Sequence, residues 1–219
     1  MKTWRYIAGG AAAALGAYLV LRPRHLRWGA TGEEIASALP LDDIVGDPTY
    51  VTNRAVTINA TPERVWPWLV QMGELPRGGF YTYAWIERLL GMDVENAAAI
   101  LPQFQDLQTG DRIDHAGNLI VRAIEPNHHV VLGPPVGTPT GDATWAIVLI
   151  PTREGTTRLL SRVRARLAAT PRGVFWLALL DPGQFIMERR WLLGVKERAE
   201  RFAGEEEEEK KIRRVPVTA

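Results

Sequence analysis

Cysteine is absent from this 219-residue chain, and only four histidines and two serines, Ser37 and Ser161, are present. The lack of cysteine excludes disulfides, thiol catalysis and cysteine-ligated zinc. Neither serine lies in a nucleophile-elbow context, and no His-Glu-x-x-His pattern occurs. His128 and His129 are adjacent, so on a strand their side chains would point to opposite faces. We therefore expect neither a metal nor a cofactor, and no Ser/His/Asp triad can be assigned.

Clustered basic charge is also missing from the body of the chain. The net charge is +1, but residues 29–204 carry 17 basic and 20 acidic side chains, a net charge of −3. This excludes the basic footprint of a nucleic-acid-binding protein. The charges concentrate at the two ends, with five basic and no acidic residues in 1–28 and five consecutive glutamates after Gly204. Such a block of like charge predicts that residues 205–219 are a charged, disordered tail.

No apolar run reaches the roughly 20 residues of a typical membrane-spanning helix. The longest run, residues 6–21, would form about 24 Å of helix and is flanked by basic residues. It predicts a membrane anchor within residues 1–28, with a cleaved signal peptide and a surface-lying helix as alternatives. The run ends in Arg-Pro-Arg rather than a small-residue cleavage site, which favours a retained anchor.

The residues in and around this run also predict the orientation of the anchor and its self-association. The flanking positive charges are slightly denser after the run, which favours a single-pass anchor with a cytoplasmic body. Gly9, Ala13 and Gly16 would let two such helices approach closely in a weak homodimer, unless they only reflect an alanine-rich composition.

Between the ends, residues 29–204 are predicted to form one domain. Thr31 and Glu34 form a capping box for a short helix, residues 49–60 read as a strand, and a helix follows from Thr61. After a second short helix near residues 82–90, five short strands separated by turn signals begin at Gly110. This order of elements, ended by a long helix, favours an α+β fold with an antiparallel sheet.

The last strand and the last helix suggest how the layers pack. Arginines alternate along residues 158–166, so we expect their face to be wet and the opposite face, with Ser161 and Ala165, to be covered. Residues 181–204 carry an apolar stripe at helical spacing, and Glu188 lies in its middle. A buried carboxylate requires a partner or a wet cavity. Glu188 is therefore either a cavity-wall residue that orients a ligand hydroxyl or amine, or the partner of an arginine such as Arg122 or Arg64, unless it is simply exposed at the surface.

Four phrases of the sequence resemble the START/polyketide cyclase-like (SRPBCC) superfamily. They are "VTINATPERVWPWLVQMG", "RGGFYTYAWIERLLG", "ILPQFQDLQTGDRI" and "GQFIMERRWLLGVKERAE", within residues 50–203. The chain is most similar to bacterial members of unassigned role. The resemblance implies a helix-grip fold, in which a curved antiparallel sheet of six to seven strands wraps around a long C-terminal helix. It also implies a hydrophobic cavity that takes up lipids, sterols or polyketides.

The candidate cavity residues are mainly aromatic, although each could equally be an ordinary core residue. Tyr81 and Tyr83 are favoured because a buried phenol needs a polar partner. The full set is Trp66, Phe80, Tyr81, Tyr83, Trp85, Arg122, Trp145, Phe185, Glu188 and Trp191.

Three functions remain open. The leading one is a membrane-anchored binding or transfer protein for an apolar small molecule. The second is a polyketide cyclase or aromatase in which Tyr81, Tyr83, Arg122 or Glu188 performs acid–base chemistry. The third is a scaffold whose interior is filled by its own side chains, and the empty volume between sheet and helix separates it from the other two.

Overall fold

Five strands form one antiparallel sheet in the computed structural model, which describes residues 16, 18–135, 143–166 and 171–214 and, in the last range, the side chains of residues 181–204. The sheet order is β1-β5-β4-β3-β2, and every neighbouring pair is antiparallel. The predicted α+β class with an antiparallel sheet is therefore confirmed. The strands are β1 (Tyr50–Ile58), β2 (Ile120–Glu125), β3 (His129–Gly133), β4 (Ala143–Pro151) and β5 (Thr157–Ala165).

The prediction of six to seven strands is not met, because the described residues form a five-stranded sheet. The stretch after Gly110, expected to open the run of strands, contributes only an isolated bridge between Arg112 and Ile120. The carboxylate of Asp114 accepts the backbone N–H groups of Asn118 and Leu119 at 3.0 and 2.9 Å. These bonds hold the stretch in a turn, in competition with strand pairing.

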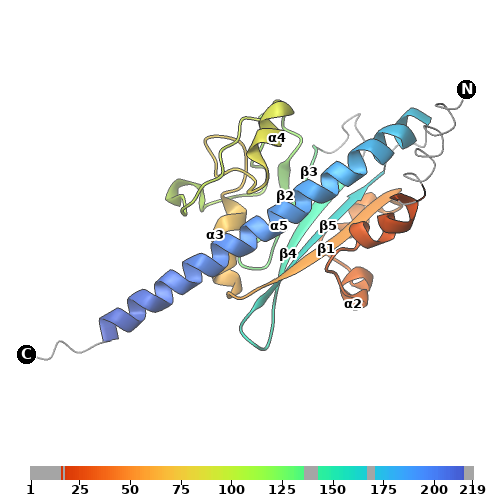
Figure 1. Cartoon of the computed structure of the whole chain (residues 1–219). Coiled ribbons are helices and arrows are strands. Elements are labelled where there is room, and N and C mark those ends of the chain that lie inside the picture. The colour runs from red at the N-terminus through yellow and green to blue at the C-terminus, as the bar shows by residue number, and fades with distance from the viewer. Residues whose placement is uncertain (1–15, 17, 136–142, 167–170, 215–219) are drawn as a thin grey trace, which may run out of the picture.

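One long helix, α5 (Pro171–Arg214), lies along one face of the sheet, as Figure 1 shows. It begins before Asp181, where the predicted apolar stripe starts, and it runs without a break through Pro182. At its other end it continues through the glutamate run to Arg214. Part of the predicted disordered tail is therefore helical, and residues 215–219 lie outside the described ranges.

The predicted apolar stripe of α5 forms the centre of the core. Leu192, Val195 and Ala199 are fully buried, and α5 packs against β1 and against α3 (Pro62–Val70). The approach is closest at Gly194, where an added Cβ would lie 2.3 Å from the carbonyl oxygen of Tyr81. Only glycine fits at this contact.

The arginine face of β5 is covered, contrary to the expectation that it is wet. Arg162 is 3% exposed and lies under α2 (Gly32–Ala36) and the 3₁₀ helix η1 (Asp42–Val45). Its guanidinium donates to the carboxylate of Asp42 at 2.6 Å and to the carbonyl oxygens of Glu34, Ile35 and Ser37. The free carbonyl groups at the end of α2 thus provide partners for a buried arginine.

The chain before α2 is helical over residues 18–26. Among the residues that the structure describes, no helix has both the length and the apolarity to cross a membrane. Most of the predicted anchor, residues 6–15 and 17, lies outside the described ranges, as do Gly9 and Ala13 of the predicted homodimer contact. The anchor, its orientation and the homodimer stay predictions.

Candidate ligand-binding cavity

A cavity of about 600 Å³ lies between α5 and the ends of β3, β4 and β5. The helix α4 (Ala84–Leu89) and its flanking residues form another wall. Most lining side chains are apolar, such as Leu119, Leu132, Val163 and Met187. Four of the ten residues predicted from the sequence line it, namely Phe80, Trp145, Glu188 and Trp191.

Three other predicted residues lie outside this lining, and each is held by a partner within the protein. Tyr81 is fully buried, and its hydroxyl donates to the carbonyl oxygen of Trp68 at 2.9 Å. Arg122 donates to the carbonyl oxygen of Pro134 at 2.6 Å. The ring of Phe185 lies 5.4 Å from the ring of His25 and packs against the guanidinium of Arg54. Their polar groups and rings are thus already paired within the protein.

The last three predicted residues also lie outside the lining. Trp66 is buried in the main core. Tyr83 and Trp85 are 39% and 67% exposed, Trp85 within α4 and Tyr83 as the residue before it. An aromatic residue on a short amphipathic segment can face either side, and the sequence pattern alone did not separate the two faces.

Glu188 lines the cavity and also forms a buried ion pair, while its predicted role in orienting a ligand stays a prediction. Its partner is Arg54 of β1, not Arg122 or Arg64. Arg54 and Gln184 donate to Oε2, and the Ser161 hydroxyl donates to Oε1 at 2.7 Å. Trp145 in turn donates from Nε1 to the Ser161 oxygen at 2.8 Å. Burial raises the pKa of Glu188, while the charge of Arg54 and these hydrogen bonds oppose that rise.

A second buried carboxylate, Asp181, joins the first part of the chain to α5. Tyr18 and Arg22 donate to its Oδ2 at 2.7 and 2.9 Å, and Nε2 of His25 lies 3.2 Å away. Tyr50 donates to Oδ1 at 2.9 Å. Burial alone would raise the pKa of Asp181, but the hydrogen bonds from Tyr18, Tyr50 and His25 outweigh it and lower the pKa. Sequence reasoning missed this site, since its members come from three distant segments.

Two polar atoms in the cavity wall have no hydrogen-bond partner among the described residues. Glu87 is 3% exposed and lies on α4. Its Oε2 atom and the hydroxyl of Thr82 are buried and form no hydrogen bond within the part of the chain that the structure describes. Burial raises the pKa of Glu87; nearby Thr82 and Arg88 oppose the rise. The Thr82 hydroxyl is close enough to moderate this pKa without forming a hydrogen bond of normal geometry with Oε2.

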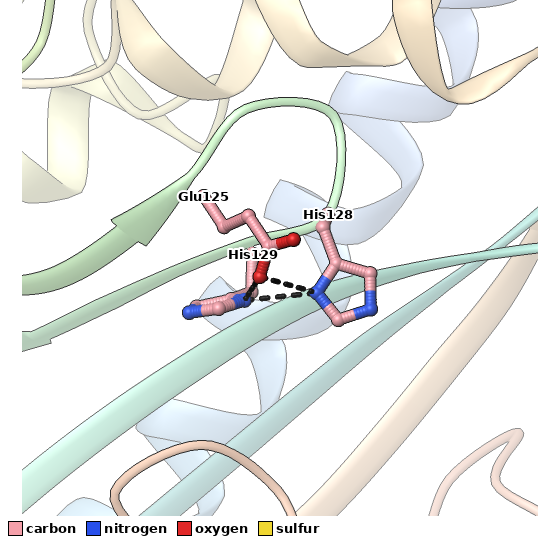
Figure 2. Close-up of side chains that lie close together, drawn as sticks. All are labelled: Glu125, His128 and His129. Carbon is pink, nitrogen blue, oxygen red and sulfur yellow. Dashed lines mark hydrogen bonds and ion pairs between the residues drawn. The ribbon is translucent and has the colours of Figure 1, made fainter.

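The two adjacent histidines point toward each other, contrary to the prediction. Figure 2 shows Nδ1 of His128 and Nδ1 of His129 facing the carboxylate of Glu125. The two nitrogens are 2.9 Å apart, and each is 3.5 Å from Oε2 of Glu125. Strand alternation does not apply because His128 lies in the turn before β3, which starts at His129.

No protein-family model and no curated protein matches the chain. Among solved structures, a protein from Mesorhizobium loti is 19% identical with a TM-score of 0.37, over 69% of this chain and 98% of its own. A Thermobifida fusca protein is 12% identical with a TM-score of 0.44, over 69% and 93%. The protein named Ara h 8.0201 is 10% identical with a TM-score of 0.35, over 67% and 97%. At these identities and TM-scores function must be inferred from the cavity itself.

Proposed function

We propose that this protein binds an apolar small molecule, of the size of a lipid, sterol or polyketide, in the cavity between the sheet and α5. The observation that carries the proposal is the cavity volume of about 600 Å³, which falls in the range of small-molecule sites. A lining of mainly apolar side chains favours a ligand with a large apolar body, because burial is worth about 25 cal/mol per Å². A volume of this size also opposes a scaffold filled by its own side chains.

The packing of the long helix on the antiparallel sheet supports the proposal further. The START/polyketide cyclase-like resemblance implied such a packing together with a cavity for hydrophobic ligands. The cyclase alternative has less support, because Tyr81 and Arg122 are held by backbone carbonyl groups and Tyr83 is outside the cavity lining. Of the four residues suggested for acid–base chemistry, only Glu188 lines the cavity.

Ligand exchange with a membrane is part of this proposal. Trp85 and Leu89 of α4 are 67% and 79% exposed, and the adjacent Leu90, which lines the cavity, is 71% exposed. Large apolar side chains exposed beside a cavity are suited to contact with the interfacial region of a bilayer. In this proposal the basic-flanked apolar run of residues 6–21 keeps the protein at the membrane, as the sequence predicts.

Extraction of the purified full chain with organic solvent, followed by mass spectrometry, tests the proposal directly. We expect a co-purified apolar molecule, and after its removal one binding site per chain for a fluorescent fatty-acid or sterol analogue, with a Kd of about 1 μM. Absence of both an extracted molecule and probe uptake would refute it.

A further inference from the structure

The two carboxylates of the cavity differ in the number of hydrogen bonds that their oxygens accept. Both oxygens of Glu188 already accept hydrogen bonds, from Ser161 on one side and from Arg54 and Gln184 on the other. This carboxylate is therefore not the best partner for a ligand. Glu87 has a buried oxygen, Oε2, that accepts no hydrogen bond within the described residues.

The position of Glu87 makes this unpaired oxygen informative. Glu87 lines the same cavity as Thr82, whose buried hydroxyl also forms no hydrogen bond with any residue that the structure describes. A buried polar group that is left unpaired costs about 1–3 kcal/mol, so such groups are rare unless something else satisfies them. Both atoms belong to the α4 wall, whereas the satisfied Glu188 belongs to α5.

We propose that the apolar ligand carries a hydroxyl or amine group that donates a hydrogen bond to Glu87, with Thr82 as a second polar contact. The ligand is thus amphipathic, with its polar end at α4 and its apolar body against Leu132, Val163 and Met187. This inference rests on the proposed binding function and names the chemistry of the ligand. It also moves the ligand-orienting role predicted for Glu188 to a carboxylate on another wall.

The test compares two fluorescent probes of similar shape, 1-aminoanthracene and anthracene, which differ in one hydrogen-bond donor. We expect the wild-type full chain to bind 1-aminoanthracene about tenfold more tightly, as a hydrogen bond to a charged or buried group allows. Glu87→Met should remove this preference while anthracene still binds. Glu154→Met, a matched change in the exposed turn between β4 and β5, should leave it intact.

The outcomes separate the two proposals. If neither probe binds, the proposed function fails. If both bind the wild type equally, or if Glu87→Met keeps the preference, only the role of Glu87 is refuted. Thermal unfolding of Glu87→Met provides a check on folding, and its melting temperature should not fall, because the change removes an unpaired buried carboxylate.

An independent observation concerns the turn between β2 and β3. The three atoms that face one another in Figure 2 form a triangle with sides of 2.9, 3.5 and 3.5 Å. A point in their plane about 1.9 Å from each atom exists, and a zinc ion with bonds of about 2.0–2.1 Å would sit just above it, as on one face of a tetrahedron. The fourth position would be open to water.

The backbone explains why these three side chains meet. Glu125 and His129 are register partners across β2 and β3, so their side chains share a face of the hairpin. The His128 N–H donates to the carbonyl oxygen of Glu125 at 3.0 Å, and Asn127 has a φ of 61°, which closes the turn.

We propose that Glu125, His128 and His129 bind one divalent transition-metal ion. Calorimetric titration of the untagged full chain with zinc chloride should give one ion per chain. His128→Ala or His129→Ala removes one of the three ligands and should weaken zinc binding at least tenfold, because the loss of even an outer-shell partner of a metal ligand costs about 10–100-fold in affinity. The matched control is His115→Ala, because His115 also contacts a carboxylate, that of Glu74, at 3.3 Å. Undetectable zinc binding, or binding that survives His128→Ala, would overturn this assignment.

Discussion

Arg54 and Glu188 face each other in the interior, where both charges have lost their hydration. The attraction within such a pair roughly offsets the cost of desolvation, whereas one charge left alone is strongly unfavourable. Ser161 and Gln184 donate further hydrogen bonds to the Glu188 carboxylate, but Nη2 of Arg54 has no hydrogen-bond partner within the described residues. The pair therefore fixes the position of α5 on β1 without adding much net stability.

Removal of one member of this pair should be far more damaging than removal of both. We expect Arg54→Met to lower the free energy of unfolding by about 3 kcal/mol, because it leaves Glu188 buried and unpaired. The double variant Arg54→Met/Glu188→Leu should recover at least half of that loss. Urea unfolding of the two single variants and the double variant gives the coupling energy. Additive losses would show that the two charges do not depend on each other.

Asp181 should make the protein sensitive to acid. Its pKa is lowered below the ordinary value of 3.8, so the folded state holds its proton less tightly than the unfolded state. The resulting stability is fully present above the unfolded pKa and is lost as the pH falls through the folded pKa. Urea unfolding between roughly pH 3 and pH 7 should show wild type more stable than Asp181→Asn near neutrality.

This advantage should shrink as the pH falls below about 4. The pKa of Glu188 is shifted upward, so its effect on the pH dependence of stability has the opposite sign. Because both proteins contain Glu188, this effect largely cancels when their stabilities are compared. Asp47→Asn, at an exposed position, serves as the control and should show no such narrowing. A stability difference that is constant over the whole range would contradict the role of Asp181.

At the scale of the elements, local sequence patterns predicted which helices and strands form, but not always which element covers a given face. The capping box of α2 is confirmed. The Thr31 N–H donates to the Glu34 carboxylate at 2.7 Å, and the Glu34 N–H donates to the Thr31 hydroxyl at 3.2 Å. The same short helix also covers the arginines of β5, and the carbonyl groups at its end accept hydrogen bonds from Arg162. These carbonyl groups are more than a hundred positions from Arg162 in the chain. Alternation along one strand contains no information about such a distant partner.

The same limit separates Glu188 from Arg54. Glu188 could be recognised because it interrupts an apolar stripe at helical spacing. Arg54 gave no comparable signal, since one charged residue in a strand of mixed polarity is unremarkable. Likewise the His128–His129 contact depends on where the turn ends and β3 begins, and a boundary shifted by one residue reverses the expected direction of a side chain.

The exposed apolar side chains of α4 should control the speed of ligand exchange. We expect the double change Trp85→Ser/Leu89→Ser to slow the transfer of a fluorescent fatty-acid analogue from phosphatidylcholine vesicles several-fold, because less apolar surface enters the membrane interface. The equilibrium affinity for the free analogue should not change, since neither side chain lines the cavity.

Stopped-flow fluorescence with vesicles and a titration without them measure the two quantities separately. Ile150→Ser, an exposed apolar position at the end of β4, is the control and should transfer ligand at the wild-type rate. An unchanged rate in the α4 variant would exclude this surface from exchange.

For the whole molecule, the cavity results from how one helix meets one sheet. α5 packs closely against α3 and β1, whereas the cavity lies between it and the ends of β3, β4 and β5. On the other face of the sheet, residues such as Ala55, Val131, Val148 and Leu160 pack into a buried apolar cluster, and none of these four lines the cavity. The two faces therefore differ in the one property on which the proposed function depends.

This difference predicts opposite responses to the same substitution. Val163→Phe would place a ring in the cavity, where it gains contacts that the empty space lacks. The melting temperature should stay the same or rise, while the affinity for anthracene falls at least tenfold. Val148→Phe would overfill the buried cluster on the other face, at a cost of about 1–3 kcal/mol. Its melting temperature should therefore fall by several degrees, while the folded protein binds anthracene normally. If Val163→Phe destabilises the protein as much as Val148→Phe does, the interior beside α5 is packed and no guest molecule fits there.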